Sequence, residues 1–199
     1  MSPFDATAVT WRDTADVARL LRRAFDAEPV QRWLFPGTGL RWVASELWFR
    51  ALIAEAIPLG TALRLVDGRS AAIWFPPGAR GGGTGIAEVL LRGVTSVSSR
   101  SARAKAELDR SLSSRRPLHD HWYLAATATE SGYRSQGRGA ALMEHTLRLC
   151  DRTAVPAYLE TSTPRSVPFY RSLGFEVCDS FSVLDGPPIW CLGRQPAVR

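Results

Sequence analysis

The feature that most limits the fold is a run of alternating elements in the C-terminal half of the 199-residue chain. Residues 121–129, "HWYLAATAT", have the composition of a strand, and residues 137–153 carry apolar side chains at helical spacing. A second strand is predicted in "PAYLETST", and a short helix in "SVPFYRSLGF", where Gly174 suits the C-terminal cap. This order predicts an α/β fold with helices flanking a sheet.

The other segments extend the sheet. Residues 9–25 suggest a short strand and then a helix with Thr14 as N-cap; Pro29 breaks that helix, and a second helix is predicted over residues 41–56. A hairpin is predicted over residues 61–78, turning at Asp67-Gly68, and another around "DGPP" near the C-terminus. The fold class is therefore α/β (α+β), a mixed central sheet of about six to seven strands in a single domain, residues 1–199.

Bulk composition excludes several classes of protein. No apolar run approaches the ~20 residues of a membrane helix, and the first residues lack the features of a signal peptide. Three sparse cysteines suit the cytoplasm and argue against zinc. The net charge of +6 fits an anionic ligand or nucleic acid, but the basic residues are scattered and no RNA-binding motif is present. The stretch "GARGGGTG" lacks the Gly-Lys-Ser/Thr ending of a nucleotide loop and suggests a connector.

The stretch "RSQGRGAAL", residues 134–142, lies between the predicted strand and the long helix. Backbone N–H groups at the start of a helix converge on one point, where the helix dipole favours an anion. Gly137 and Gly139 permit close approach of a phosphate, and Arg134 and Arg138 can add charge-assisted hydrogen bonds. From these residues alone, a phosphate cradle and a basic flexible loop both remain open.

The spacing Arg134-x-x-Gly137-x-Gly139 resembles the Q/R-x-x-G-x-G/A signature of the GNAT acetyltransferases. Downstream, "FYRSLGF" is similar to the F-Y-x-x-x-G-F of that family, and "WRDTADVARLLRRAF" resembles its usual first strand and helix. The resemblance covers most of the chain and is strongest from His121 to Arg194. The stretches "HWYLA", "AYLETSTPRSVPFY" and "GPPIWC" resemble the puromycin N-acetyltransferase branch.

The resemblance implies that an acetyl group passes from acetyl-CoA to an amine by direct attack in a ternary complex, without a metal. The stretch from Arg134 to Ala140 would wrap the pyrophosphate. The strand at Thr127 to Thr129 would pair with the pantetheine arm and splay from residues 157–161 in a V shape. The implied cofactor contacts are Thr127, Ala128, Thr129, Arg134, Ser135, Gln136, Gly137, Arg138, Gly139, Ala140, Thr163, Ser166 and Phe169.

The resemblance also suggests catalytic residues. Tyr170 occupies the tyrosine of the F-Y motif and would protonate the departing thiolate; a core aromatic beside Phe169 is the alternative. Glu160 is the candidate base, acting directly or through water, with a structural carboxylate satisfied by backbone or arginine as the alternative. Residues 1–118 would supply most of the acceptor site. Glu28 would hold a cationic substrate, with a surface charge at a helix end as the alternative. Trp33 and Phe35 would line the pocket together with Trp190 from the last strand, although such aromatics are more often core.

Several residues depart from the family pattern. Thr127 and Thr129 replace common valines or leucines of the central strand, and Thr163 stands where many members carry asparagine. Ser135 stands in place of a common glycine and brings a hydroxyl that could bind phosphate. Arg138 stands where an aliphatic residue usually packs under the loop, so it is expected to face solvent or phosphate and to leave the loop mobile or weakened.

The function expected from these features is acetylation of a primary amine on a small molecule, such as an antibiotic or another natural product. The chain would act as a cytoplasmic monomer or homodimer, with no nucleic-acid or membrane partner. A protein or peptide acceptor, another acyl-CoA donor, and a nucleic-acid-binding module are the alternatives.

Overall fold

A computed structural model describes residues 2, 4–79 and 98–197. Its elements run in the order β1 (Ala6–Ala8), α1 (Thr14–Phe25), α2 (Pro29–Leu34), α3 (Thr38–Ala56), β2 (Ala62–Leu65), β3 (Ser70–Phe75), α5 (Ser99–Ser113), β4 (Trp122–Thr129), α6 (Arg138–Thr153), β5 (Ala157–Thr161), α7 (Val167–Ser172), β6 (Glu176–Phe181) and β7 (Ile189–Arg194). Short 3-10 turns are η1 (Trp11–Asp13), η2 (Ile57–Leu59), η3 (Ser131–Tyr133) and η4 (Pro164–Ser166). Residues 80–97, which include most of "GARGGGTG", lie outside the described residues.

The seven strands form one sheet in the order β1-β2-β3-β4-β5-β7-β6. β4 and β5 are parallel, whereas the other described pairs are antiparallel. The predicted mixed α/β fold is therefore confirmed. In the described ranges, no helix is both long and apolar enough to cross a membrane.

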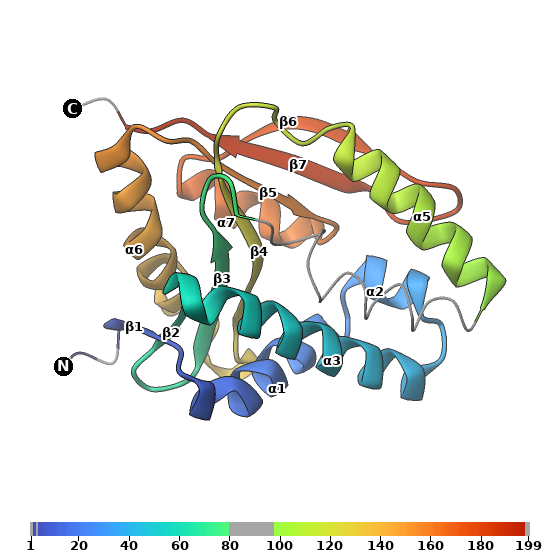
Figure 1. The fold of residues 1–199 in the computed structure, drawn as a ribbon, viewed down its shortest axis with the longest axis horizontal. Helices are drawn as coiled ribbons and strands as arrows, with labels where there is room; N and C mark the ends of the chain where they lie inside the picture. The colour runs from blue at the N-terminus through green and yellow to red at the C-terminus, as the bar shows by residue number, and fades with distance from the viewer. Residues whose placement is uncertain (1, 3, 80–97, 198–199) are drawn as a thin grey trace.

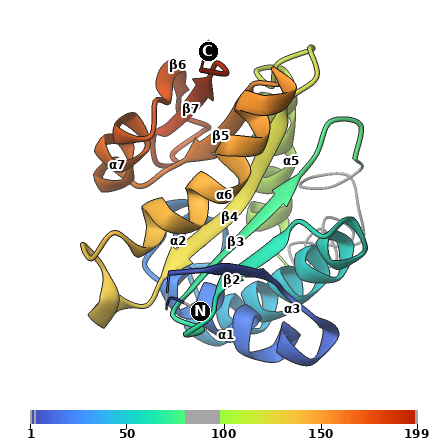
Figure 2. The same cartoon turned by 90° about the vertical axis from the view of Figure 1, so that its left-hand side faces the viewer.

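Helices cover both faces of this sheet (Figures 1 and 2). On one, the α6 face, α6 and α7 pack over a cluster that includes Leu124, Leu142 and Leu159. On the other, the α3 face, α1 and α3 pack over a cluster that includes Leu21 and Ile73. A third cluster joins α2, α3 and α5 to the β6–β7 turn. The apolar stripe predicted along α6 is buried, as its helical spacing requires.

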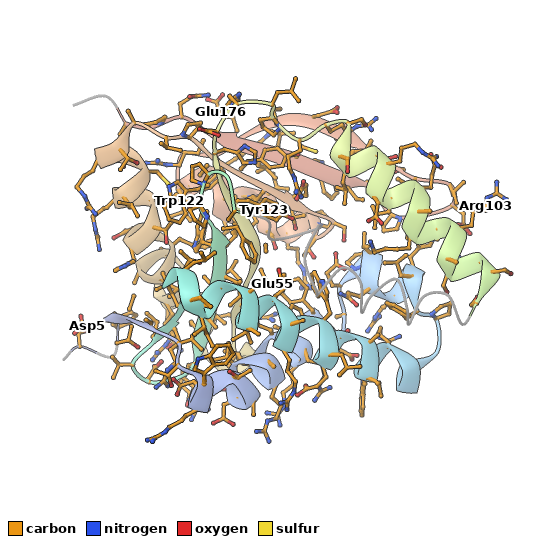
Figure 3. All side chains as sticks on the ribbon, in the orientation of Figure 1. Asp5, Glu55, Arg103, Trp122, Tyr123 and Glu176 are labelled. Carbon is orange, nitrogen blue, oxygen red and sulfur yellow. The ribbon has the colours of Figure 1, made fainter. Side chains whose placement is uncertain are left out.

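A β-bulge at Ala125 changes which side chains of β4 point to which face. Leu124 pairs with Trp74 and Ala126 pairs with Ile73, so Ala125 is left between them without a partner on β3. Before the bulge, Trp122 belongs to the cluster on the α6 face and Tyr123 packs against the cluster on the α3 face (both labelled in Figure 3). An extra residue in one strand reverses the alternation beyond it. Ala126 and Ala128 accordingly pack on the α3 face.

Three expectations about the N-terminal half need correction. The first strand is Ala6–Ala8, because residues 11–13, predicted as strand, form a 3-10 turn closed by a capping box between Thr10 and Asp13. Pro29 does not simply end a helix: it is the first residue of α2, a position where its missing N–H costs nothing. The next helix begins at Thr38, three residues before the predicted start.

Candidate active site

β4 and β5 are paired over a short distance and then separate. Their register runs through Trp122↔Ala157, Tyr123↔Tyr158 and Leu124↔Leu159, and ends there. Beyond that point β4 is paired with β3 and β5 with β7, out to Thr129 and Thr161. The separation begins beside the bulge at Ala125, where extra twist is expected. This pairing agrees with the predicted splay and leaves one edge of residues 125–129 available for an extended ligand.

The signature loop connects this free edge to α6. Gly137 caps the helix with φ 78°, a left-handed conformation suited to glycine, and Ser135 also has a positive φ of 60°. The N–H of Ala141 donates to Gly137 O at 3.0 Å, and this is the first backbone hydrogen bond of α6. The N–H groups of the first helical turn that precede it, among them those of Gly139 and Ala140, are of the kind that binds anions.

Gly139 lies where three elements meet. A Cβ added there would be 3.2 Å from Phe169 Cζ, on α7, and 3.7 Å from Thr129 Oγ1, at the end of β4. The aromatic ring of Phe169 therefore takes up the space that a side chain at position 139 would need. The start of α6, the end of β4 and α7 thus converge at the predicted pyrophosphate site.

The arginines of the loop do not behave alike. Arg134 is exposed, and its Nε donates to Thr129 O at 3.2 Å, so it ties the loop to the last residue of β4. The expectation that Arg138 faces solvent is wrong, and its contact with phosphate stays a prediction. Its side chain is only 12% exposed, and its guanidinium is hydrogen-bonded and ion-paired to Asp67 in the β2–β3 turn. The turn supplies a carboxylate where the family pattern has apolar packing.

The other predicted cofactor residues lie along the same path. Thr127 Oγ1 donates to Ala71 O at 3.3 Å, and Thr129 Oγ1 shares a 3.0 Å hydrogen bond with Ser70 Oγ. Gln136 Nε2 contacts Gly132 O at 3.5 Å within the loop. Ala128 differs from Thr127 and Thr129 because its side chain packs on the α3 face. Beyond β5, Thr163 precedes η4 and Ser166 is its last residue, and the N–H of Ser166 donates to Thr163 O at 2.9 Å.

Tyr170 lies in the buried cluster on the α6 face. Its ring centroid is 5.3 Å from that of Phe169 and 6.0 Å from that of Phe175. Desolvation raises the pKa of its phenol well above the ordinary value, so the group remains protonated at neutral and mildly alkaline pH. Tyr170 is thus both a packed aromatic and a hydroxyl that keeps its proton.

Glu28 is placed beside β5 by the start of α2. It caps that helix, its carboxylate accepts the N–H of Gln31 at 2.8 Å, and the Ser162 hydroxyl donates to its other oxygen. The N–H of Val30 donates to Ser162 Oγ at 3.3 Å, which fastens α2 to the end of β5. Desolvation outweighs these hydrogen bonds and raises the pKa of Glu28 from 4.5 to about 7. A carboxyl group of this kind can exchange a proton near neutral pH.

Glu160, the predicted base, has a different environment. Its Oε1 is 3.6 Å from Arg116 Nη2, and its side chain is 8% exposed. The Arg116 guanidinium lies 4.1 Å from the ring centroid of Tyr123, on the α3 face. Desolvation raises the pKa of the Tyr123 phenol, and the nearby Glu160 carboxylate adds to that rise. Glu160 therefore belongs to a cluster with a guanidinium and a phenol.

The aromatic residues predicted to line the acceptor pocket are not brought together. Trp33 Nε1 donates to Asp185 Oδ1 at 2.8 Å, and its ring packs against Gly186 in the β6–β7 turn. Phe35 is 1% exposed and belongs to the same cluster, so it has no free surface for a ligand. Trp190 packs on the α6 face, on the opposite side of the sheet from Trp33.

Residues that sequence reasoning missed include Ser162, Arg116 and Asp67. Each acts through a partner far along the chain: Ser162 is 134 residues from Glu28, and Asp67 is 71 residues from Arg138. The turn at Asp67 was predicted, but its partner was not. In the described part of the chain, no three His, Cys, Asp or Glu side chains gather in a way that could hold a metal ion.

Known proteins share this arrangement. Residues 108–175 match the model of the acetyltransferase (GNAT) family. A Corynebacterium glutamicum structure, described as "histone acetyltransferase HPA2 and related acetyltransferase", is 23% identical, with a TM-score of 0.69 over 98% of this chain and 97% of its own. The polyamine N-acetyltransferase of Drosophila melanogaster is 14% identical, with a TM-score of 0.69 over 96% of this chain and 99% of its own. Arylalkylamine N-acetyltransferase 2 of Aedes aegypti is also 14% identical, with a TM-score of 0.64 over 97% and 99%.

The similarity to the three structures is one of fold, since the identities are low. The sequence match includes β4, the signature loop, α6 and α7, which converge at Gly139, together with β5. The acetyltransferase (GNAT) family model thus matches residues 108–175, and the fold is shared with the three structures along nearly the whole chain.

Proposed function

We propose that the protein transfers an acetyl group from acetyl-CoA to a primary amine of a small molecule, with Glu28 as the proton acceptor and Tyr170 as the proton donor. The observation that carries this proposal is the separation of β4 from β5, with the signature loop at the end of one strand and Glu28 at the end of the other. The pantetheine arm would follow the free edge of β4, and the pyrophosphate would lie at the start of α6.

In this reaction the amine nitrogen attacks the thioester carbonyl carbon. A carbon–nitrogen bond forms, the carbon–sulfur bond breaks, and both proton transfers are assigned to residues of this chain. An alkylamine is largely protonated near pH 7, and the Glu28 carboxylate takes the proton that must leave the nitrogen. Tyr170 gives its proton to the sulfur of the departing thiolate.

Glu28 is preferred to Glu160 as the acceptor because of what each contacts. Glu28 has hydroxyl and N–H partners and a pKa of about 7, so both of its protonation states are populated at neutral pH. Glu160 lies 3.6 Å from the guanidinium of Arg116, so it already acts as a partner of that cation. Glu160 remains the second candidate, acting through water.

A small acceptor is favoured over a protein by the contacts that α2, which begins just after Glu28, makes with α5 and the β6–β7 turn. Arg100 of α5 donates to Trp33 O at 2.9 Å and to Asp185 at 3.2 Å, and Trp33 itself donates to Asp185. Ser101 Oγ donates to Leu34 O at 2.7 Å. These bonds fasten α2, α5 and the β6–β7 turn to one another, which restricts the space for a polypeptide. The Drosophila and Aedes proteins of the same fold are described as acting on polyamines and arylalkylamines.

The test is a panel of amines incubated with acetyl-CoA. It should include polyamines, agmatine, arylalkylamines, puromycin and other amino-bearing antibiotics, and a peptide with a free N-terminus. Release of free thiol with a gain of one acetyl group on a small amine is the expected result. Acetylation of the peptide alone would replace the small acceptor with a protein, and failure to bind CoA at millimolar concentration would remove the proposal altogether. Turnover of puromycin in the panel would support the branch that the sequence resembles.

A further inference from the structure

Arg138, which departs from the pattern of the family that the sequence resembles, forms an ion pair with another side chain. Arg138 is the first residue of α6, and its guanidinium bonds to the carboxylate of Asp67. The two side chains are 12% and 22% exposed. A charge-assisted hydrogen bond between partly buried groups is stronger than one at the surface, so this pair holds the start of α6 to the β2–β3 turn.

The turn that carries Asp67 is fixed without help from the loop. One carboxylate oxygen of Asp67 accepts the N–H of Arg69 at 3.0 Å, and the N–H of Gly68 donates to Leu65 O at 2.9 Å. Gly68 has a φ of 70°, which the turn requires. Asp67 therefore presents its second oxygen to Arg138 from a rigid base.

Further contacts hold the Arg138 side chain along its length. Its guanidinium carbon is 5.0 Å from the ring centroid of Tyr133 and 5.2 Å from that of Phe4, and its Nε donates to Gln136 Oε1 at 3.3 Å. Tyr133 precedes the loop and Gln136 lies within it. One guanidinium thus connects the entrance of the loop, its interior and the first turn of α6.

This arrangement affects a bound phosphate through the backbone. An anion at the start of α6 is held by N–H groups whose directions are set by the conformation of residues 134–140. A loop that has to be ordered during binding reduces the affinity, whereas a loop already held in place does not. Asp67 also neutralises Arg138, so the side chain brings little net charge to the phosphate.

We propose that Asp67 is a positioning residue for the cofactor: through Arg138 it holds the signature loop in the conformation that binds the pyrophosphate of acetyl-CoA. This inference rests on the proposed function, since it concerns the same cofactor site. It assigns Arg138 to the support of the loop instead of to direct contact with phosphate.

The experiment measures CoA binding by titration calorimetry for the full-length protein and for Asp67→Asn, Arg138→Met and the double variant. Each single change is expected to raise the Kd for CoA about tenfold, the size of effect seen when a charge-assisted hydrogen bond is lost. The double variant should be no weaker than the weaker single variant, because both changes remove the same contact. Glu144→Gln is the control: it removes an exposed ion pair with Arg148 on the same helix and should leave the Kd unchanged.

Kinetics separate positioning from a general loss of structure. Asp67→Asn should raise KM for acetyl-CoA while kcat at saturation stays close to that of the wild type. With S-acetylpantetheine, which has no pyrophosphate, wild type and Asp67→Asn should have the same KM. If Asp67→Asn does not fold, as judged by circular dichroism, Arg138→Met tests the contact from its other end with the same two donors.

The outcomes are distinct. If Asp67→Asn binds CoA as tightly as wild type or more tightly while Arg138→Met binds it weakly, then Arg138 is itself a phosphate ligand and the inference is overturned. An equal loss with both donors would also overturn it. If the wild-type protein does not bind CoA, the proposed function is contradicted instead. CoA binding by the wild type is therefore measured before any variant is compared.

Discussion

The two faces of the sheet contribute to the active site in different ways. On the α6 face, the proposed cofactor site comes from one nearly continuous stretch of chain, and much of its expected chemistry resides in the backbone of residues 134–140. On the α3 face, the proposed acceptor site comes from side chains of distant segments, such as Glu28 and Ser162. A backbone site built from one stretch is visible as a motif, whereas a site assembled from separate segments depends on the fold.

The largest expected effect belongs to the acceptor side. Replacing Glu28 by Gln keeps the shape and the acceptor for the N–H of Gln31 but removes the proton acceptor. We expect kcat to fall by roughly 10²- to 10³-fold, within the usual range for a general base. In the wild type, log kcat/KM should fall as pH drops below about 7, where Glu28 becomes protonated, and this limb should be absent in the variant.

Two further variants test this prediction. Asp16→Asn, at an exposed site on α1, should have wild-type kinetics. If Glu160→Gln removes the acidic limb while Glu28→Gln retains it, the roles of the two carboxylates are exchanged.

Glu28 should also lower the free energy of unfolding as the pH rises. Folded Glu28 holds its proton up to about pH 7, whereas in the unfolded chain the group ionises near 4.5. Between these values the folded state binds more protons, so the free energy of unfolding decreases as pH rises. Gln cannot ionise, and from pH 4.5 to pH 8 the stability of Glu28→Gln should therefore increase relative to wild type by about 3 kcal/mol. Urea unfolding at the two pH values measures this, and a constant difference would contradict the raised pKa.

On the α6 face, Tyr170→Phe should lower kcat by about ten- to a hundredfold, because only the proton donor is lost. The packing against Phe169 and Phe175 is retained, so the Kd for CoA should not change. In the wild type, the raised pKa of this phenol predicts no loss of activity from its ionisation below pH 10. Unchanged turnover in the variant would assign Tyr170 to the core alone.

The smallest effects concern the two glycines of the loop. Gly139→Ala should weaken CoA binding several-fold, since the new Cβ would lie 3.2 Å from Phe169. Phe169→Leu in the same chain makes room and should restore part of the affinity. Gly137→Ala has open space but a positive φ, so its cost of about 1 kcal/mol is conformational and Phe169→Leu should not relieve it. If Phe169→Leu restored the CoA affinity of both variants equally, contact with Phe169 would limit both positions.

Sequence reasoning succeeded where the determinants are local. The hairpin at Asp67-Gly68, the stripe along α6 and the cap at Gly174 follow from neighbouring residues, and so does the position of Gly137 at the start of a helix. Pro29 shows how a local signal can be misjudged: a proline that excludes the middle of a helix is favoured at its first turn.

What the sequence did not reveal has long-range causes. The ion pair of Arg138 was not predicted because its partner, Asp67, lies in another hairpin. The raised pKa of Glu28 depends on burial between α2 and the end of β5, which no neighbouring residue reveals. Trp33 and Trp190 were grouped by residue type, yet the sheet separates them.

The unpaired residue at Ala125 lies where β4 changes its neighbours. Residues 122–124 pair with both β3 and β5, whereas residues 126–129 pair with β3 among the described strands. Deletion of Ala125 would bring Leu124 next to Ala126, and these two already pair with the adjacent residues Trp74 and Ile73, so Thr127 and Thr129 would keep the face that they have now. The deletion would instead remove the extra twist of the bulge at the point where β4 leaves β5. We therefore expect the separation of the two strands, and not the direction of their side chains, to depend on this one alanine.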